Sequence, residues 1–127
     1  MSAPIRVALC DDARAVKFFL RAVLEEDGDM EVVATTSTGA EALEAVGETR
    51  PDILLLDLVL PDVPEPAELV RDLRSRAPGT AILLMSNMPA PRLQAEAERI
   101  GTDGWMPKAH KAELVRETVR EIVAARP

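Results

Sequence analysis

The sequence predicts an α/β domain in which a parallel sheet is covered by helices on both faces. Strand-like and helix-like hydrophobic patterns alternate five times along the 127 residues. Such alternation is typical of βαβ units joined by right-handed crossovers. Several of the strand-like runs are almost uninterrupted in apolar residues, as expected for strands buried on both faces. We therefore expect a doubly wound sheet of five parallel strands.

The first half of the chain contains three of these strands and two helices. Ile5–Cys10 is the first strand. Apolar residues spaced three and four apart then predict an amphipathic helix, with Val16, Phe19, Leu20, Val23 and Leu24 on one face. Met30–Thr35 is the most polar run and predicts an edge strand. Thr38–Gly39 opens a second helix, and the unbroken run Ile53–Leu56 predicts a central, fully buried strand.

The second half repeats the alternation after a proline-rich turn, Pro61–Pro66. A helix with Leu69, Val70 and Leu73 on one face precedes the strand Ala81–Met85. The helix near Pro91–Ile100 has only a thin apolar stripe. Trp105–Pro107 predicts an edge strand, because proline cannot donate to a sheet ladder. The last predicted helix has apolar residues and one threonine on one side: Leu114, Val115, Thr118, Val119 and Ile122.

Length and composition restrict the classes of function. A chain of 127 residues fits one domain, residues 1–127, and its formal charge of −7 argues against direct binding of nucleic acid. The single cysteine, Cys10, permits no intrachain disulfide, and we expect it to be a small buried side chain. The chain has no signal-peptide layout and no apolar run near the roughly 20 residues of a membrane helix. We expect a cytoplasmic protein with no membrane partner.

Polar residues follow four of the five predicted strands. Asp11–Asp12 follow the first strand, Asp57 the third, Ser86 the fourth and Lys108 the fifth. Parallel strands gather such residues at one edge of the sheet. Three carboxylates there would repel one another unless they shared a cation, and oxygen ligands favour Mg²⁺. Asp57, facing a hydroxyl and an ammonium group, is then predicted to accept a phosphoryl group.

Each of these residues has a simpler interpretation when taken alone. Asp12 could be the N-cap of the next helix, Ser86 a turn residue and Lys108 a solvated surface residue. Asp57 is more informative, since a buried strand that ends on a charge needs a reason. The four positions together favour one chemical site.

On these residues the chain resembles the receiver domain of bacterial two-component response regulators, over nearly all of its length. The resemblance rests on Asp11–Asp12, Leu54–Asp62, Ser86, Lys108, Gly39–Leu43 and Gly101–Trp105. It implies a flavodoxin-like sheet with strand order 2-1-3-4-5, as in single-domain chemotaxis regulators. One departure is the loop Val63–Pro66, where the family often has glycine; we expect this loop to be stiffer and more acidic.

The resemblance also implies a Mg²⁺ site and a phosphoacceptor. Asp57 would accept the phosphoryl group from a phosphohistidine. Asp12 and Asp57 would bind the Mg²⁺ ion directly, the Val59 carbonyl would be a third ligand, and Asp11 would reach the ion through water. The domain would then catalyse its own phosphorylation and dephosphorylation, without being an independent turnover enzyme.

Three further roles follow from the same resemblance. Lys108 would neutralise one phosphoryl oxygen, and Ser86 would donate a hydrogen bond to another. Ser86 would also act as the switch that senses the phosphate, together with Trp105 on the fifth strand.

The implied partners are proteins. A histidine kinase or a histidine phosphotransfer protein would supply the phosphate in a phosphorelay. No output segment follows the last predicted helix, so the output would be a downstream protein target, or the chain would be a fragment of a regulator with a missing output domain. A dimer through the fourth helix, fifth strand and last helix is a further expectation.

Two other functions stay open at this point. One is a degenerate receiver that binds partners without phosphorylation, although all five polar groups are present. The other is a Mg²⁺-dependent phosphatase on a related fold. Such an enzyme uses a second aspartate two residues after the nucleophile, and here that residue is Val59.

Overall fold

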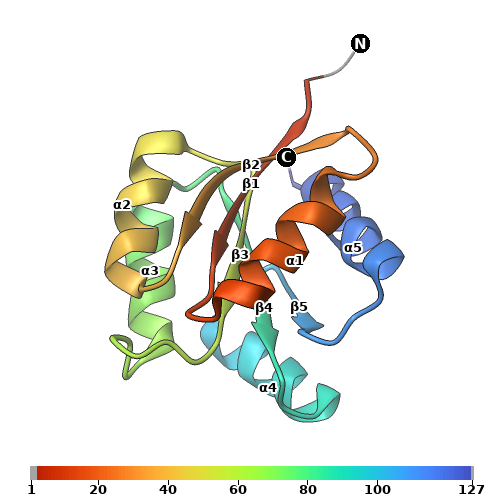
Figure 1. Cartoon of the computed structure of the whole chain (residues 1–127). Helices are drawn as coiled ribbons and strands as arrows, with labels where there is room; N and C mark the ends of the chain where they lie inside the picture. Colours follow the sequence, from red (N-terminus) through yellow and green to blue (C-terminus); the bar gives the residue numbers. More distant parts are fainter. Residues whose placement is uncertain (1–2, 127) are drawn as a thin grey trace.

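Five parallel strands form one sheet in a computed structural model that describes residues 3–126 (Figure 1). The strands are β1 Ile5–Cys10, β2 Met30–Thr36, β3 Ile53–Asp57, β4 Ala81–Ser86 and β5 Gly104–Pro107. The helices are α1 Arg14–Glu25, α2 Gly39–Thr49, α3 Pro66–Arg76, α4 Ala90–Ile100 and α5 Ala112–Ala124. The strand order is β2-β1-β3-β4-β5, as in flavodoxin-like folds, so the predicted fold class is confirmed.

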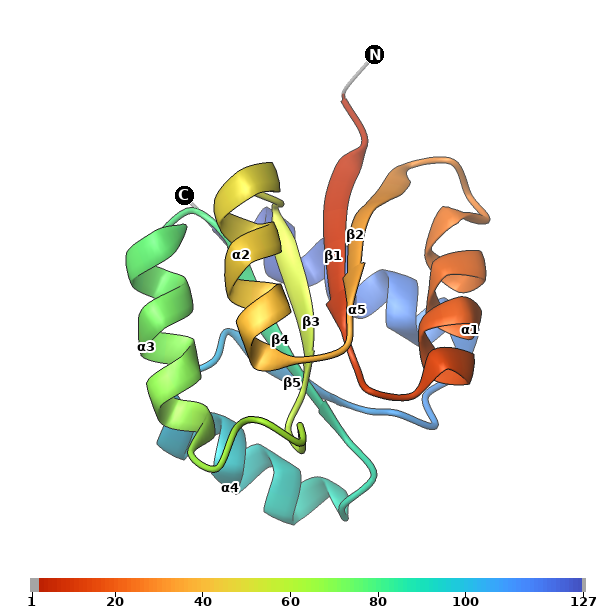
Figure 2. The same cartoon turned by 60° about the vertical axis from the view of Figure 1, so that its left-hand side comes forward.

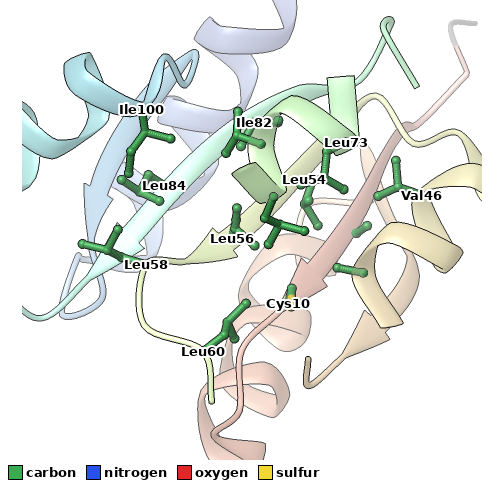
Figure 3. Close-up of a cluster of buried hydrophobic side chains, with 14 of the residues drawn as sticks. Cys10, Val46, Leu54, Leu56, Leu58, Leu60, Leu73, Ile82, Leu84 and Ile100 are labelled. Atoms are coloured by element: carbon green, nitrogen blue, oxygen red, sulfur yellow. The ribbon is translucent and has the colours of Figure 1, made fainter. Parts of the chain in front are cut away.

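Alternate residues of each strand build two separate cores. Helices α1 and α5 cover one face of the sheet, and α2, α3 and α4 cover the other (Figure 2). In β3, Leu54 and Leu56 point to the three-helix side, while Ile53 and Leu55 point to the two-helix side. Figure 3 shows the three-helix core, which continues past the end of β3 to Leu58 and Leu60. Both faces are therefore closed, and the period-two pattern of β3 is hidden because every residue is buried.

The predicted edge strands lie at the edges. β2 and β5 are the outer strands, and Pro107 ends β5, where its missing N–H costs no ladder hydrogen bond. Helix α4 buries Leu93, Ala97 and Ile100, the residues of its predicted apolar stripe. No helix between residues 3 and 126 has the length and apolar character needed to cross a membrane.

Strand register brings the ends of the central strands level with one another. Cys10 pairs with Leu56, so Asp11 and Asp57 are the next residues of neighbouring strands. In the β4–β5 pair, Ser86 lies opposite Pro107, the residue before Lys108. The polar residues that follow β1, β3, β4 and β5 therefore share the carboxyl edge.

Candidate functional site

Three carboxylates meet at the carboxyl edge of the sheet. Asp11, Asp12 and Asp57 each offer an oxygen within 4.8 Å of the others. Asp11 and Asp57 are buried, with 0% and 4% of their surfaces exposed, whereas Asp12 is exposed. Lys108 Nζ lies 2.8 Å from Asp11 Oδ2 and 3.0 Å from Asp57 Oδ2. The Lys108 ammonium therefore pairs with two of the three carboxylates, and negative charge remains in excess.

Asp11 is held by the start of the following helix. Its Oδ1 accepts a hydrogen bond of 2.8 Å from the Ala13 amide. Its Oδ2 is buried and, apart from the nearby Lys108 ammonium, has no hydrogen-bond donor of good geometry. The alternative that Asp12 caps α1 is wrong, because the N-cap is Ala13 and no side chain caps that helix. Asp12 is left free to face the cluster.

Both carboxylate oxygens of Asp57 have partners that fix the side chain. Oδ1 accepts a hydrogen bond from the Val59 amide at 3.2 Å, and Oδ2 faces Lys108. Burial raises the pKa of Asp57, and the hydrogen bonds from Lys108 and Val59 only partly oppose this effect. For Lys108, burial alone would lower the pKa, but the contacts with Asp11 and Asp57 outweigh burial and raise it. Lys108 therefore stays a cation at neutral pH.

Ser86 is the last residue of β4 and lies beside Lys108. Its carbonyl accepts a hydrogen bond from the Lys108 amide at 3.0 Å, and its Oγ accepts one from the Met88 amide at 3.1 Å. Trp105 is half-buried in β5, opposite Leu84, and packs against the three-helix core. The switch roles expected for Ser86 and Trp105 stay predictions.

The donor set fits a hard divalent cation. All three clustered side chains offer oxygen atoms, and a buried carboxylate oxygen of Asp11 lacks a well-directed hydrogen bond. A cation there would satisfy that oxygen and reduce the repulsion between the carboxylates. Val59 follows Asp57 in the loop, and its carbonyl as a further ligand stays a prediction.

Several features around this site were not expected from the sequence. Asp62, five residues after Asp57, binds the first amides of α2. Helix α1 exposes both phenylalanines of the chain, Phe18 at 79% and Phe19 at 48%, so the prediction that Phe19 belongs to the buried apolar face of this helix is wrong. Cys10 was expected to be buried and is; burial raises the pKa of its thiol to about 11, so the thiol is protonated at neutral pH.

Residues 7–120 match the family model of the response regulator receiver domain. The chain belongs to this family. The receiver is 32% identical over 122 residues to the DNA-binding transcriptional activator DevR/DosR of Mycobacterium tuberculosis. The aligned region covers 96% of this chain and 56% of that protein. The receiver thus spans about half the length of this curated relative.

Solved structures agree with this assignment. The signal receiver domain of the response regulator NarL from Mycobacterium tuberculosis matches with a TM-score of 0.89 and 26% identity, over 98% of this receiver and 100% of that chain. A chain from the crystal structure of the P1 domain of CheA3 in complex with CheY6 from R. sphaeroides matches with a TM-score of 0.85 and 25% identity, over 98% and 100% of the two chains. The predicted family, two-component signalling and the receiver fold are confirmed.

Proposed function

We propose that this receiver accepts a phosphoryl group from a phosphohistidine onto Asp57, in a Mg²⁺-dependent reaction in the cytoplasm, and that the acyl phosphate switches its protein contacts. The observation that carries the proposal is the position of Lys108. Its ammonium touches the buried carboxylates of Asp11 and Asp57 at 2.8 and 3.0 Å, next to the exposed Asp12. A lysine that served only to neutralise charge would not leave a third carboxylate unpaired beside it.

The reaction requires a nucleophile, charge neutralisation and room for a donor. An Asp57 carboxylate oxygen forms a bond to phosphorus as the bond between phosphorus and the imidazole nitrogen breaks. Asp12, Asp57 and the Val59 carbonyl would hold Mg²⁺ directly and Asp11 would reach it through water, and the bound ion would supply positive charge for the phosphoryl oxygens. Lys108 is already at the nucleophile and neutralises another oxygen. Ser86 donates its hydroxyl hydrogen to a third.

The donor is a protein in this proposal, a histidine kinase or a histidine phosphotransfer protein. Support comes from the solved complex of the CheA3 P1 domain with CheY6, which includes a chain of this fold. The site itself is small and polar, so selectivity for a protein donor must come from the surface around it. The curated relative, of which the match covers 56%, is a DNA-binding transcriptional activator, and the proposal includes an output domain on the same chain as one route to a response.

The surface beside the site that suits such a donor is on α1. A groove of about 560 Å³ is lined by Asp12 of the carboxylate cluster and by Arg14, Lys17, Phe18 and Arg21 of α1, among others. Arg14, Phe18 and Arg21 are spaced four and three apart and so lie along one face of the helix. On a protein of charge −7, this face suits a partner with an apolar pocket for Phe18 and acidic residues for Arg14 and Arg21.

The output switch would use the surface formed by α4, β5 and α5. Ser86 moving toward the phosphate would vacate space beside β5, and Trp105 would shift inward. Helix α4, which packs on the sheet through Leu93, Ala97 and Ile100, would be the element that moves. The change would be a population shift between two packings of α4, β5 and α5, and the same face would form any dimer.

One experiment tests the proposal. The purified receiver is incubated with acetyl phosphate and Mg²⁺, and the intact protein is weighed. A gain of one phosphoryl group that maps to Asp57, and that disappears when EDTA replaces Mg²⁺, is the expected result. Amide chemical shifts from residues 86 to 110 should change in the same sample. No mass gain would reject the phosphoacceptor role, and a gain without changes in those shifts would reject the switch alone.

A further inference from the structure

The loop that follows the phosphoacceptor is hydrogen-bonded to the first turn of α2. Asp62 lies in the segment between β3 and α3. Its Oδ1 accepts a hydrogen bond of 2.8 Å from the Gly39 amide, and its Oδ2 accepts one of 3.1 Å from the Ala40 amide. Gly39 and Ala40 are the first residues of α2, where the backbone N–H groups have no partner within the helix. These amides lower the pKa of Asp62, so the carboxylate is charged and held at neutral pH.

An apolar contact reinforces this tie. Val63, the next residue, packs so closely under α2 that a Cβ on Gly39 would clash with its Cγ2 methyl group. Glycine at the start of α2 therefore lets the loop approach the helix without a shift of Val63. The Val63 amide also donates to the Leu60 carbonyl at 3.2 Å, which closes a turn around Pro61.

The other end of the same short segment is part of the site. The Val59 amide donates to Asp57 Oδ1, and the Leu58 amide donates to the Met85 carbonyl at 2.9 Å. Leu60 is buried in the core beneath the loop. The backbone of Val59 therefore lies between the fixed end of β3 and the anchor at Asp62. Pro61, whose ring restricts φ, stiffens the connection.

We propose that Asp62 is a positioning residue for the phosphoacceptor site: its grip on α2 fixes the backbone at Val59, and through it the Asp57 carboxylate and the cation that the cluster binds. The inference rests on the proposed function for the identity of that cation and of the reaction. Asp62 itself touches neither Asp57 nor the reacting atoms; it acts through the loop.

The structure offers a matched control on the same helix end. Thr38 is the N-cap of α2, and its Oγ1 accepts a hydrogen bond from the Glu41 amide at 3.1 Å. Thr38→Ala and Asp62→Ala each remove side-chain acceptors from the first turn of α2, but only the second frees the loop. Asp62→Asn keeps one oxygen and so one of the two amide contacts. Unfolding in urea, Mg²⁺ affinity by calorimetry and the rate of phosphorylation by acetyl phosphate are measured for all four proteins.

We expect Asp62→Ala to weaken Mg²⁺ binding about tenfold, as loss of an outer residue that orients metal ligands typically does. Asp62→Asn should lie between Asp62→Ala and wild type. Thr38→Ala should lose stability but keep the Mg²⁺ affinity within about twofold of wild type, since it leaves the loop tied. If Asp62→Ala does not fold, the position of Asp62→Asn relative to Thr38→Ala decides the matter.

Other outcomes overturn the inference. Equal Mg²⁺ affinities in the Asp62 variants and wild type would show that the contact only caps α2, and so would equal losses in Thr38→Ala. A wild-type receiver that binds no Mg²⁺ would also reject it. A receiver that binds Mg²⁺ with the expected order of affinities but never gains a phosphoryl group would reject the proposed function and leave the positioning role of Asp62 standing.

Discussion

The carboxylates at the amino end of the sheet have well-matched donors, whereas those at the carboxyl end do not. At the amino end, Asp103 accepts hydrogen bonds from the Ile82 amide at 2.7 Å and from Arg74 and Arg126 at 3.1 Å each. Asp52 accepts one from the Arg6 amide at 2.8 Å. At the carboxyl end, three carboxylates cluster and one lysine pairs with two of them, Asp11 and Asp57. The amino end is arranged for stability, and the carboxyl end holds negative charge that costs stability until a cation binds.

This difference explains why the site is at one end only. The Asp103 carboxylate is already neutralised by two arginines, so it has little to gain from a further cation. The cluster around Asp57 combines burial, like charge and an Asp11 oxygen whose one close partner is the Lys108 ammonium, and this combination favours taking up a further positive partner. Functional sites commonly keep such destabilising features because activity depends on them.

The largest effect is expected from Asp57→Asn, which should abolish phosphorylation by acetyl phosphate. An amide cannot form the acyl phosphate. Because burial raises the pKa of Asp57, the site disfavours the charged form, and the neutral amide should raise the free energy of unfolding by on the order of 1 kcal/mol. Intact mass and urea unfolding measure the two effects. A phosphorylated mutant would remove Asp57 from its role, and a less stable mutant would contradict the charge imbalance.

Mg²⁺ should stabilise the wild type and have little effect on Asp12→Ala. An ion that binds only the folded state at 100 times its dissociation constant adds about 2.7 kcal/mol by mass action. Asp12 is the exposed member of the cluster, so its removal should cost little packing while it removes a ligand. Thermal unfolding with and without Mg²⁺ measures the shift. Equal shifts in the two proteins would mean that Asp12 is not a ligand.

Asp103→Ala tests the opposite end of the sheet. The change leaves the Ile82 amide and two arginines without their acceptor, and unfolding should become easier by about 2 kcal/mol. Phosphorylation by acetyl phosphate should proceed at the wild-type rate under conditions where both proteins are folded. Urea unfolding and intact mass give the two readouts. A slower reaction in the folded variant would mean that the two ends are not independent.

Much of this architecture was predictable because it depends on local patterns. The unbroken run of β3 and the spacing of apolar residues in α1 reflect burial, which the order of residues along the chain reveals. Parallel strands then bring Asp11, Asp57 and Lys108 to one edge. The partners of Asp62 were not predictable, since Gly39 lies 23 residues away and the contact depends on how the loop folds back. The ion pairs of Asp103 are equally non-local.

Phe18→Ala and the double variant Arg14→Glu, Arg21→Glu test the surface beside the carboxyl end. Each should slow phosphotransfer from a protein donor about tenfold, as loss of a central anchor in an interface does. The rate with acetyl phosphate should not change, because the small donor makes no use of α1. The protein donor is found by profiling the phosphorylated histidine kinases of the source organism and taking the fastest. Parallel losses with both kinds of donor would place the defect in the site rather than in docking.

The smallest effect concerns how long the phosphate persists at this end of the sheet. Val59, two residues after Asp57, is 69% exposed, and Met88, two residues after Ser86, lines the same groove of about 300 Å³. Both side chains are apolar, so neither orients a water molecule by hydrogen bonding, and both are large enough to obstruct one on its way to the acyl phosphate. The alternative is that they only pack against the rim of the site.

The double variant Val59→Asn, Met88→Glu distinguishes these possibilities. Polar groups at both positions should hold a water molecule in line with the phosphorus atom and speed the loss of phosphate about fivefold, which corresponds to roughly 1 kcal/mol of activation free energy. The decay is followed by intact mass after the donor is removed, at fixed Mg²⁺. Leu114→Asn, which makes a similar change at an exposed residue of α5, is the control. Equal decay in the double variant and wild type would mean that access of water is set elsewhere, by the Asp57 backbone or by Lys108.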